Sequence, residues 1–224
     1  MLFAFAASVL IVGCWSSSPL AKSRIVNGTE VQPPHKYPWI VFLESNKVFV
    51  VCGGSLLNKR VVLTAAHCTA KEGLKPEDLT VHLGVHQNPL RFNESGVVWV
   101  RVHKFLQHPD YVMEGPATYY DYSLLTLMED IKFSDHIGPI ALPNDQSQQY
   151  IGTRAVIAGW GVTTLFGELE MTDVLMETNV MVLASDKYGL YSKDFDITEE
   201  MVCAGAPFTD ACTGDSGGEI HPIT

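Results

Sequence analysis

Three residue types that together perform nucleophilic catalysis occur in three separate segments of this 224-residue chain. Near the C-terminus, Ser216 lies within the letters TGDSGG at positions 213–218. The surrounding glycines leave room for a substrate to approach the backbone, and they leave N–H groups free to stabilise a developing oxyanion. This segment therefore predicts a nucleophilic serine, and a flexible surface loop is the alternative interpretation.

Two upstream residues complete the chemistry that such a serine requires. A serine hydroxyl is a poor nucleophile unless a general base lies within hydrogen-bond reach and a third group orients that base. His67 is the candidate base, because it ends an apolar run among small residues and a cysteine. Asp121 is the candidate orienting group, because it enters an apolar strand-like run, where a carboxylate is costly to bury without a partner. Three other aspartates compete for this role from more polar segments: Asp110, Asp130 and Asp135.

Short β-rich runs must position these side chains. They are separated by clusters of Gly, Pro, Asn and Asp, and segments with helical periodicity are scarce, which favours barrels or a sandwich. A short helix is expected at 187–191, helix remains an alternative at 65–71, and the polar, Pro-containing stretch 134–149 is interpreted as a linker. The expected strands are 40–43, 48–51, 60–63, 79–83, 97–102, 123–127, 155–158 and 179–183.

The first residues indicate export. Residues 2–12 are apolar and uncharged, and small residues follow them, as in a signal peptide. The run is too short to span a membrane. A buried strand or helix and a lipoprotein site at Cys14 are the alternatives. We expect residues 1–18 to be a signal peptide and the protein to be secreted, extracellular and not membrane-bound.

The cysteines fit an oxidising compartment. Removal of the leader takes Cys14 away and leaves four cysteines, which allow three disulfide connectivities. A bridge between Cys52 and Cys68 would close a short loop and stabilise the fold by about 3 kcal/mol. The sequence contains no CxxC pair and no Cys/His cluster with zinc spacing, so no metal and no cofactor are expected.

The composition restricts the class of partner. Apolar residues make up 46% of the chain, which suffices for a sizeable core, and the formal net charge is −10. So acidic a chain repels phosphate backbones, and nucleic-acid binding is not expected.

Seven motifs in a fixed order make the chain resemble the trypsin/chymotrypsin family of serine peptidases. The order of the candidate residues, His then Asp then Ser, is the chymotrypsin order. The resemblance runs from position 25 to the end of the chain. The motifs are IVNG at 25–28, CGGSL at 52–56, TAAHC at 64–68, DYSLL at 121–125, GWG at 159–161, MVCAG at 201–205 and GDSGG at 214–218.

The resemblance implies a role for each candidate. His67 is the expected general base and acid, Asp121 its orienting partner and Ser216 the nucleophile. The N–H groups of Gly214 and Ser216 are the expected oxyanion hole, and Asp210 is expected at the base of the substrate pocket, where it would select Lys or Arg. A polar turn residue is the alternative for Asp210.

The resemblance also implies activation by cleavage. Arg24 and Ile25 would form the activation site, and the new amino group of Ile25 would pair with Asp215. An activating protease, protein or peptide substrates with Lys or Arg, and protein protease inhibitors are the expected partners.

The implied fold is all-β, with two antiparallel six-stranded barrels and the site between them. Residues 19–24 would be the activation peptide, 25–138 the first barrel and 139–224 an incomplete second barrel.

Several positions depart from the family pattern. Only eight residues follow Ser216, which suggests either a fragment or a natural truncation. Cys203 and Cys212 lack their usual partners, and a bridge between them is one alternative. In the loop where some trypsins bind calcium, Val85 replaces an expected carboxylate, so no calcium site is predicted there. Asn93 is the favoured glycosylation site.

The expected function is therefore secreted endopeptidase activity after Lys or Arg. An inactive homologue that acts by binding and an enzyme acting on non-peptide esters are the competing hypotheses.

Overall fold

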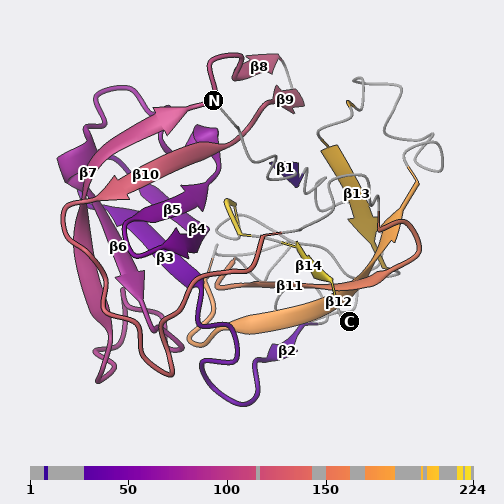
Figure 1. The fold of residues 1–224 in the computed structure, drawn as a ribbon, viewed down its shortest axis with the longest axis horizontal. Helices are drawn as coiled ribbons and strands as arrows, with labels where there is room; N and C mark the ends of the chain where they lie inside the picture. The colour runs from indigo at the N-terminus through magenta and orange to yellow at the C-terminus, as the bar shows by residue number, and fades with distance from the viewer. Residues whose placement is uncertain are drawn as a thin grey trace.

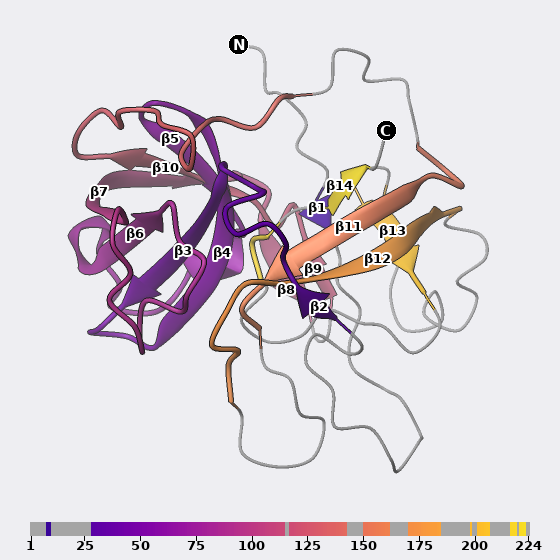
Figure 2. The ribbon, with the colours of Figure 1, turned by 90° about the horizontal axis from the view of Figure 1, so that it is seen from below.

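The computed structural model describes most of the first half of the chain and separate parts of the second half. Described are residues 8–9, 28–114, 117–142, 150–161, 170–184, 198, 201–206, 216–218 and 220–222. Two groups of strands lie beside each other in this part of the chain (Figures 1 and 2). Its only helical segments are two 3-10 turns, η1 (Ala66–Cys68) and η2 (Pro76–Asp78). None of its helices is long and apolar enough to cross a membrane.

The first group is a closed antiparallel barrel of six strands. Its order is β10-β5-β4-β3-β6-β7. Every second side chain of a strand faces the barrel interior. In β6, the leucines and the valine at 79, 81 and 83 are fully buried, while the two residues between them are half-buried. The barrel interior is a core of aliphatic side chains. The strands are β3 (Ile40–Ser45), β4 (Val50–Asn58), β5 (Val61–Thr64), β6 (Leu79–Leu83), β7 (Val98–Gln107) and β10 (Ser123–Leu127).

The second group is an open six-stranded sheet within the described residues. The order β1-β13-β12-β11-β14 is completed by β2, which pairs with the first two residues of β12. Its two longest strands, β11 and β12, pair over six positions. The bounds are β1 (Ser8–Val9), β2 (Thr29–Glu30), β11 (Arg154–Gly159), β12 (Met176–Leu183), β13 (Met201–Gly205) and β14 (Ile220–Pro222).

A separate apolar cluster joins the barrel to the second sheet. Phe42 on β3 packs against Trp160, which follows β11, with ring centres 5.5 Å apart in an edge-to-face arrangement. Both side chains are almost completely buried. Val31, before the barrel, and Leu175, before β12, belong to the same cluster. The two groups of strands are therefore held by a continuous core, on which the geometry of any site between them depends.

The all-β architecture and the first barrel confirm the sequence prediction. Strands 79–83 and 123–127 have the predicted bounds, and β3, β5, β11 and β12 differ by a few residues at their ends. β4 runs to Asn58 because glycines permit close approach: a Cβ at Gly54 would lie 2.7 Å from the carbonyl oxygen of Leu63 on β5.

The remaining expectations are partly corrected. The alternative helix at 65–71 is only the turn η1. The two-stranded hairpin of β8 (Val112–Glu114) and β9 (Ala117–Tyr119) was not predicted, and neither were β1, β2, β13 and β14, because their runs are short. The helix expected at 187–191 lies outside the described residues.

The predicted linker begins as part of the barrel. Ile137 is buried in the barrel core, and the amide of Ile140 donates to the carbonyl of Leu56 on β4, at 2.8 Å. Residues 143–149 lie outside the described part of the chain.

Candidate active site

His67 is fixed on the barrel by the turn that follows β5. The amide of Thr69 donates to the carbonyl of Ala66 at 2.9 Å, which closes the 3-10 turn around His67. The next residue, Cys68, is bridged to Cys52 on β4, with their Cα atoms 6.4 Å apart. The predicted disulfide is therefore present, and it fastens the turn that carries His67 to a neighbouring strand.

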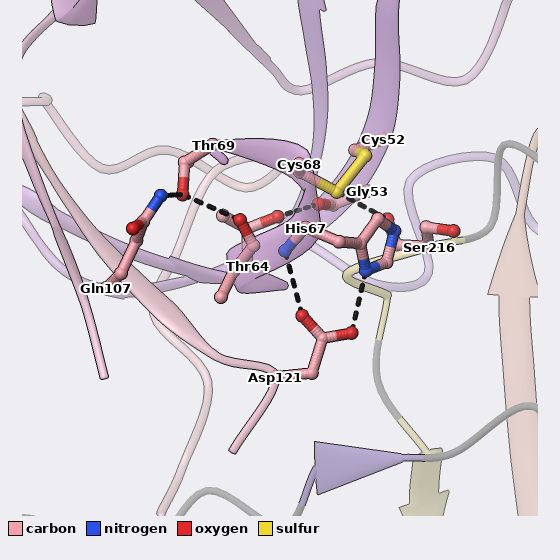
Figure 3. The surroundings of a disulfide bond; sticks show 10 residues. Cys52, Gly53, Thr64, His67, Cys68, Thr69, Gln107, Asp121 and Ser216 are labelled. Carbon is pink, nitrogen blue, oxygen red and sulfur yellow. Dashed lines mark hydrogen bonds and ion pairs between the residues drawn. A yellow bond between two sulfur atoms is a disulfide. The ribbon is translucent and has the colours of Figure 1, made fainter. Parts of the chain in front are cut away.

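Asp121 holds His67 through two hydrogen bonds (Figure 3). One carboxylate oxygen, Oδ1, accepts from the backbone N–H of His67 at 2.8 Å, and the other, Oδ2, lies 2.7 Å from its ring Nδ1. A neutral imidazole that donates its Nδ1–H to a carboxylate leaves Nε2 with a free lone pair. About a third of the His67 side chain is exposed, so this second nitrogen belongs to a partly accessible base.

The competing aspartates have other surroundings. The Asp130 carboxylate pairs with Arg60 at 3.3 Å, and its side chain is largely exposed. Asp110 lies beside His108, with a carboxylate–ring distance of 3.9 Å. Asp135 is exposed. Of the four aspartates considered from the sequence, only Asp121 meets His67.

Ser216 lies beside His67 because its turn docks on the barrel. The carbonyl of Ser216 accepts a hydrogen bond of 2.7 Å from the amide of Gly53 on β4. Figure 3 shows Ser216 beside the imidazole of His67, with Asp121 on the other side of that ring. Residues far apart in the sequence therefore meet at one point: His67 and Asp121 from the barrel, and Ser216 from the segment before β14.

Gly217 makes this docking sterically feasible. Its φ of 81° lies in the left-handed region that favours glycine. A Cβ at this position would lie 2.3 Å from Thr64 Oγ1 and 2.6 Å from the carbonyl oxygen of Gly53. These two groups are themselves joined, because the Thr64 hydroxyl donates to the Gly53 carbonyl at 2.7 Å. The serine turn is thus held against the hydrogen-bonded pair of Gly53 on β4 and Thr64 on β5, which we call the seat of the serine turn.

His67, Asp121 and Ser216 lie together, but the hydrogen bond between nucleophile and base is not formed. Between the described residues, no hydrogen bond joins Ser216 Oγ to His67 Nε2. Such bonds are often long without a substrate and tighten in the complex. Chemically, the arrangement supplies an oriented base next to a hydroxyl, as nucleophilic acyl transfer requires.

The seat of Gly53 and Thr64 was not recognised as part of the site from the sequence. The signal was present, since both residues lie inside the motifs at 52–56 and 64–68. The turn that carries His67 is also linked to β7. The side-chain amide of Gln107 on β7 donates to Thr69 Oγ1 at 3.1 Å.

The two cysteines beside His67 do not form a metal centre with it. Cys52, His67 and Cys68 lie close enough together to hold an ion. The two sulfurs are bonded to each other, however, so neither can act as a thiolate ligand.

Several predicted residues lie outside the described part of the chain. These are Gly214, Asp215, Asp210, Cys212, Arg24 and Ile25. Cys203 on β13 has a free thiol, and burial raises its pKa. Asn93 lies exposed in the loop before β7, as a glycan acceptor requires.

Comparison with known proteins finds the same family throughout. The sequence model of the trypsin family matches residues 25–221. Trypsin 5G1 of Aedes aegypti is 34% identical over 209 residues, which cover 92% of this chain and 74% of that protein. The clotting factor G beta subunit of Tachypleus tridentatus is 32% identical over 212 residues, covering 88% of this chain and 65% of the relative.

A solved structure extends the similarity to the fold. Neuropsin, a serine protease expressed in the limbic system of mouse brain, matches with a TM-score of 0.73 and 31% sequence identity. The match covers 88% of this chain and 82% of neuropsin.

Proposed function

Because the chain belongs to the trypsin family of serine proteases, we propose that it is a secreted endopeptidase that hydrolyses peptide bonds after Lys or Arg. Ser216 is the nucleophile, His67 the general base and acid, and Asp121 the residue that orients His67. The observation that carries this proposal is the pair of hydrogen bonds that Asp121 accepts from His67, beside the docked serine turn.

The reaction proceeds in two acyl-transfer steps, for which the family supplies the general template. Ser216 Oγ attacks the peptide carbonyl while His67 Nε2 takes the hydroxyl proton. Asp121 stabilises the resulting imidazolium, which then gives the proton to the leaving amine. Water, deprotonated by the same histidine, releases the acyl group and restores Ser216.

Two further groups complete the proposed chemistry. The N–H groups of Gly214 and Ser216 donate to the oxyanion of each tetrahedral intermediate, where preorganised donors lower the barrier strongly. Asp210 pairs with the Lys or Arg side chain of the substrate. A site built around a charge rejects substrates that leave this charge unpaired. Both assignments rest on the family motif.

We propose that the chain is made as a zymogen. Residues 1–18 are the leader, and β1 is removed with it. Residues 19–24 are the activation peptide, 25–138 the first barrel and 139–224 the incomplete second barrel. Cleavage between Arg24 and Ile25 frees an amino group that pairs with Asp215, and a buried ion pair of this kind can lock one loop geometry. An activating protease, peptide substrates and protein inhibitors are the corresponding partners.

The test is a cleavage map. The purified chain is cut after Arg24 with an immobilised protease, which is then removed, and the product is incubated with a peptide library and analysed by mass spectrometry. We expect cleavage after Lys and Arg, with kcat/KM for these substrates at least about a hundredfold lower in Asp210→Asn. A Ser216→Ala preparation controls for carried-over protease.

The alternatives give different outcomes. Cleavage after other residues, unaffected by Asp210→Asn, would refute the specificity but not the peptidase. A folded, correctly cut chain that turns over esters alone would identify a non-peptide esterase. No turnover of either substrate class would instead support an inactive homologue that acts by binding.

A further inference from the structure

Three histidines from separate segments of the chain meet beside the junction of the barrel with the second sheet. His35 lies before the barrel, His86 in the loop after β6, and His136 after β10. The ring centres of His35 and His136 are 4.2 Å apart, and those of His35 and His86 are 6.1 Å apart. We refer to these three residues as the histidine cluster.

Two of these imidazoles each have one nitrogen engaged by a carboxylate. Nε2 of His35 lies 3.3 Å from Glu94, and Nε2 of His86 lies 3.0 Å from Glu30. A neutral imidazole that donates from Nε2 carries its lone pair on Nδ1. Metal-bound histidines are usually oriented in this way, with the non-ligating N–H donated to a carboxylate.

The nitrogens that carry those lone pairs are buried and unpartnered. Nδ1 of His35 and Nδ1 of His86 make no hydrogen bond although both atoms are buried. His86 as a residue is only 5% exposed. Each unpaired buried polar atom is unfavourable, so two in one cluster call for an explanation.

The backbone of His35 is unusual as well. His35 has a φ of 61°, in the left-handed region that a non-glycine residue rarely adopts. Unusual backbone geometry of this kind is concentrated at functional sites.

From this geometry we propose that the histidine cluster binds a divalent transition metal such as zinc. His35 and His86 supply Nδ1, the exposed His136 supplies a third nitrogen, and Glu94 and Glu30 orient the rings from behind. Zinc–nitrogen bonds of about 2.0–2.1 Å place two imidazole centres on one ion roughly 5 Å apart, between the two observed separations. Neither observed separation equals this value, so the rings must move to close on one ion, and the exposed His136 can turn to do so.

The donor set selects the class of metal. Imidazole nitrogens suit zinc, copper and nickel, whereas calcium and magnesium require oxygen ligands. The oxygen of Glu94 that does not face His35 already accepts the amides of His86 and Gln87, both at 2.8 Å. Calcium is therefore not the ion proposed.

Binding here would couple the two groups of strands. The carbonyl of His86 accepts from the amide of Leu175 at 2.8 Å and from Trp160 Nε1 at 3.0 Å, and both donors belong to the second group. The three histidines come from the segment before the barrel, from a loop within it and from the segment after it. An ion would join these segments next to the apolar cluster of Phe42 and Trp160, and it should stabilise the folded chain.

No metal site was expected from the sequence, because it has no CxxC pair and no Cys/His cluster with zinc spacing. The three histidines lie about fifty residues apart in it. Only the fold brings them together, so this proposal departs from that expectation.

The test measures the melting temperature of the Ser216→Ala chain, chosen to prevent self-digestion, with and without zinc chloride. At a free zinc concentration of about one hundred times Kd, we expect a rise of roughly 5 °C or more, with one ion bound per chain by calorimetry. Magnesium should give no rise. His136→Ala should abolish most of the zinc effect, because it removes one of the three ligands. This exposed side chain can be removed without loss of the fold.

Two controls make the result specific. His103 on β7 is also exposed but lies outside the cluster, so His103→Ala should keep the full zinc response. His67→Ala separates the cluster from the catalytic histidine. The visible spectrum of the cobalt(II)-loaded chain gives a second readout. It should show bands of cobalt bound to nitrogen, and these bands should be lost in His136→Ala. A melting temperature insensitive to zinc, or a response that persists in His136→Ala and vanishes in His67→Ala, would overturn the proposal.

Discussion

Replacement of Gly217 by alanine tests whether docking of the serine turn controls catalysis. The left-handed backbone at this residue, φ 81°, costs an alanine about 1–2 kcal/mol. The added Cβ would also lie 2.3 Å from Thr64 Oγ1, 2.6 Å from the Gly53 carbonyl oxygen and 3.0 Å from the amide nitrogen of Ala65. Ordinary van der Waals contacts begin near 3.5 Å, so the turn must move by about 1 Å.

Such a displacement acts directly on Ser216, the preceding residue. A misplacement of about 1 Å can lower an enzymatic rate by about a hundredfold, and we therefore expect kcat/KM of Gly217→Ala to fall by at least that factor. The assay is hydrolysis of a Lys or Arg peptide ester and amide by the activated chain, at equal concentrations of folded protein.

Gly152 provides the matched control. Its φ of 80° is nearly identical, but a Cβ there would meet no atom within 4 Å. Gly152→Ala therefore carries the backbone strain without the collision, and it should retain near-normal kcat/KM. If Gly217→Ala kept activity within about twofold of the unchanged chain, the seat formed by Gly53 and Thr64 would not position the serine, and the reasoning would be refuted.

Three other predictions concern single features of the structure. Asp121→Asn should lower kcat by about 10⁴ with little change in KM, as the same replacement does in the family template, because His67 loses its orienting carboxylate; an unchanged kcat in steady-state assays would exclude this role. Replacing both Cys52 and Cys68 by alanine should reduce the free energy of unfolding by about 3 kcal/mol, measured in urea, and a loss below about 1 kcal/mol would show that the bridge hardly constrains the unfolded chain. The thiol of Cys203 should react with iodoacetamide more slowly at pH 8 than a free cysteine, because burial raises its pKa; equal rates by mass spectrometry would contradict this burial.

The sequence was most informative where local pattern alone determines structure. The strands 79–83 and 123–127 were predicted with their observed bounds, since both are short β-rich runs between turn residues. His67 and Asp121 were predicted as partners because an aspartate at the start of an apolar strand needs one, and the structure places them 2.7 Å apart.

Features that depend on contacts between distant segments were not predicted. The length of β4 depends on how closely Gly54 approaches β5, and no local signal reveals that distance. The seat of the serine turn requires Gly53, Thr64 and Gly217 to meet, and the histidine cluster requires three segments to converge. Tertiary packing alone creates such arrangements, whereas the short hairpin β8–β9 has too few residues to give a periodic signal.

The most direct test of the central claim is labelling by a fluorophosphonate probe, which reacts only with an activated serine. After cleavage at Arg24, the account predicts stoichiometric labelling of Ser216, located by peptide mass spectrometry, and loss of labelling in His67→Ala. Before cleavage, labelling should be much weaker. A folded and correctly cleaved chain that takes up no probe, or one labelled equally in His67→Ala, would contradict the claim that His67 and Asp121 activate Ser216.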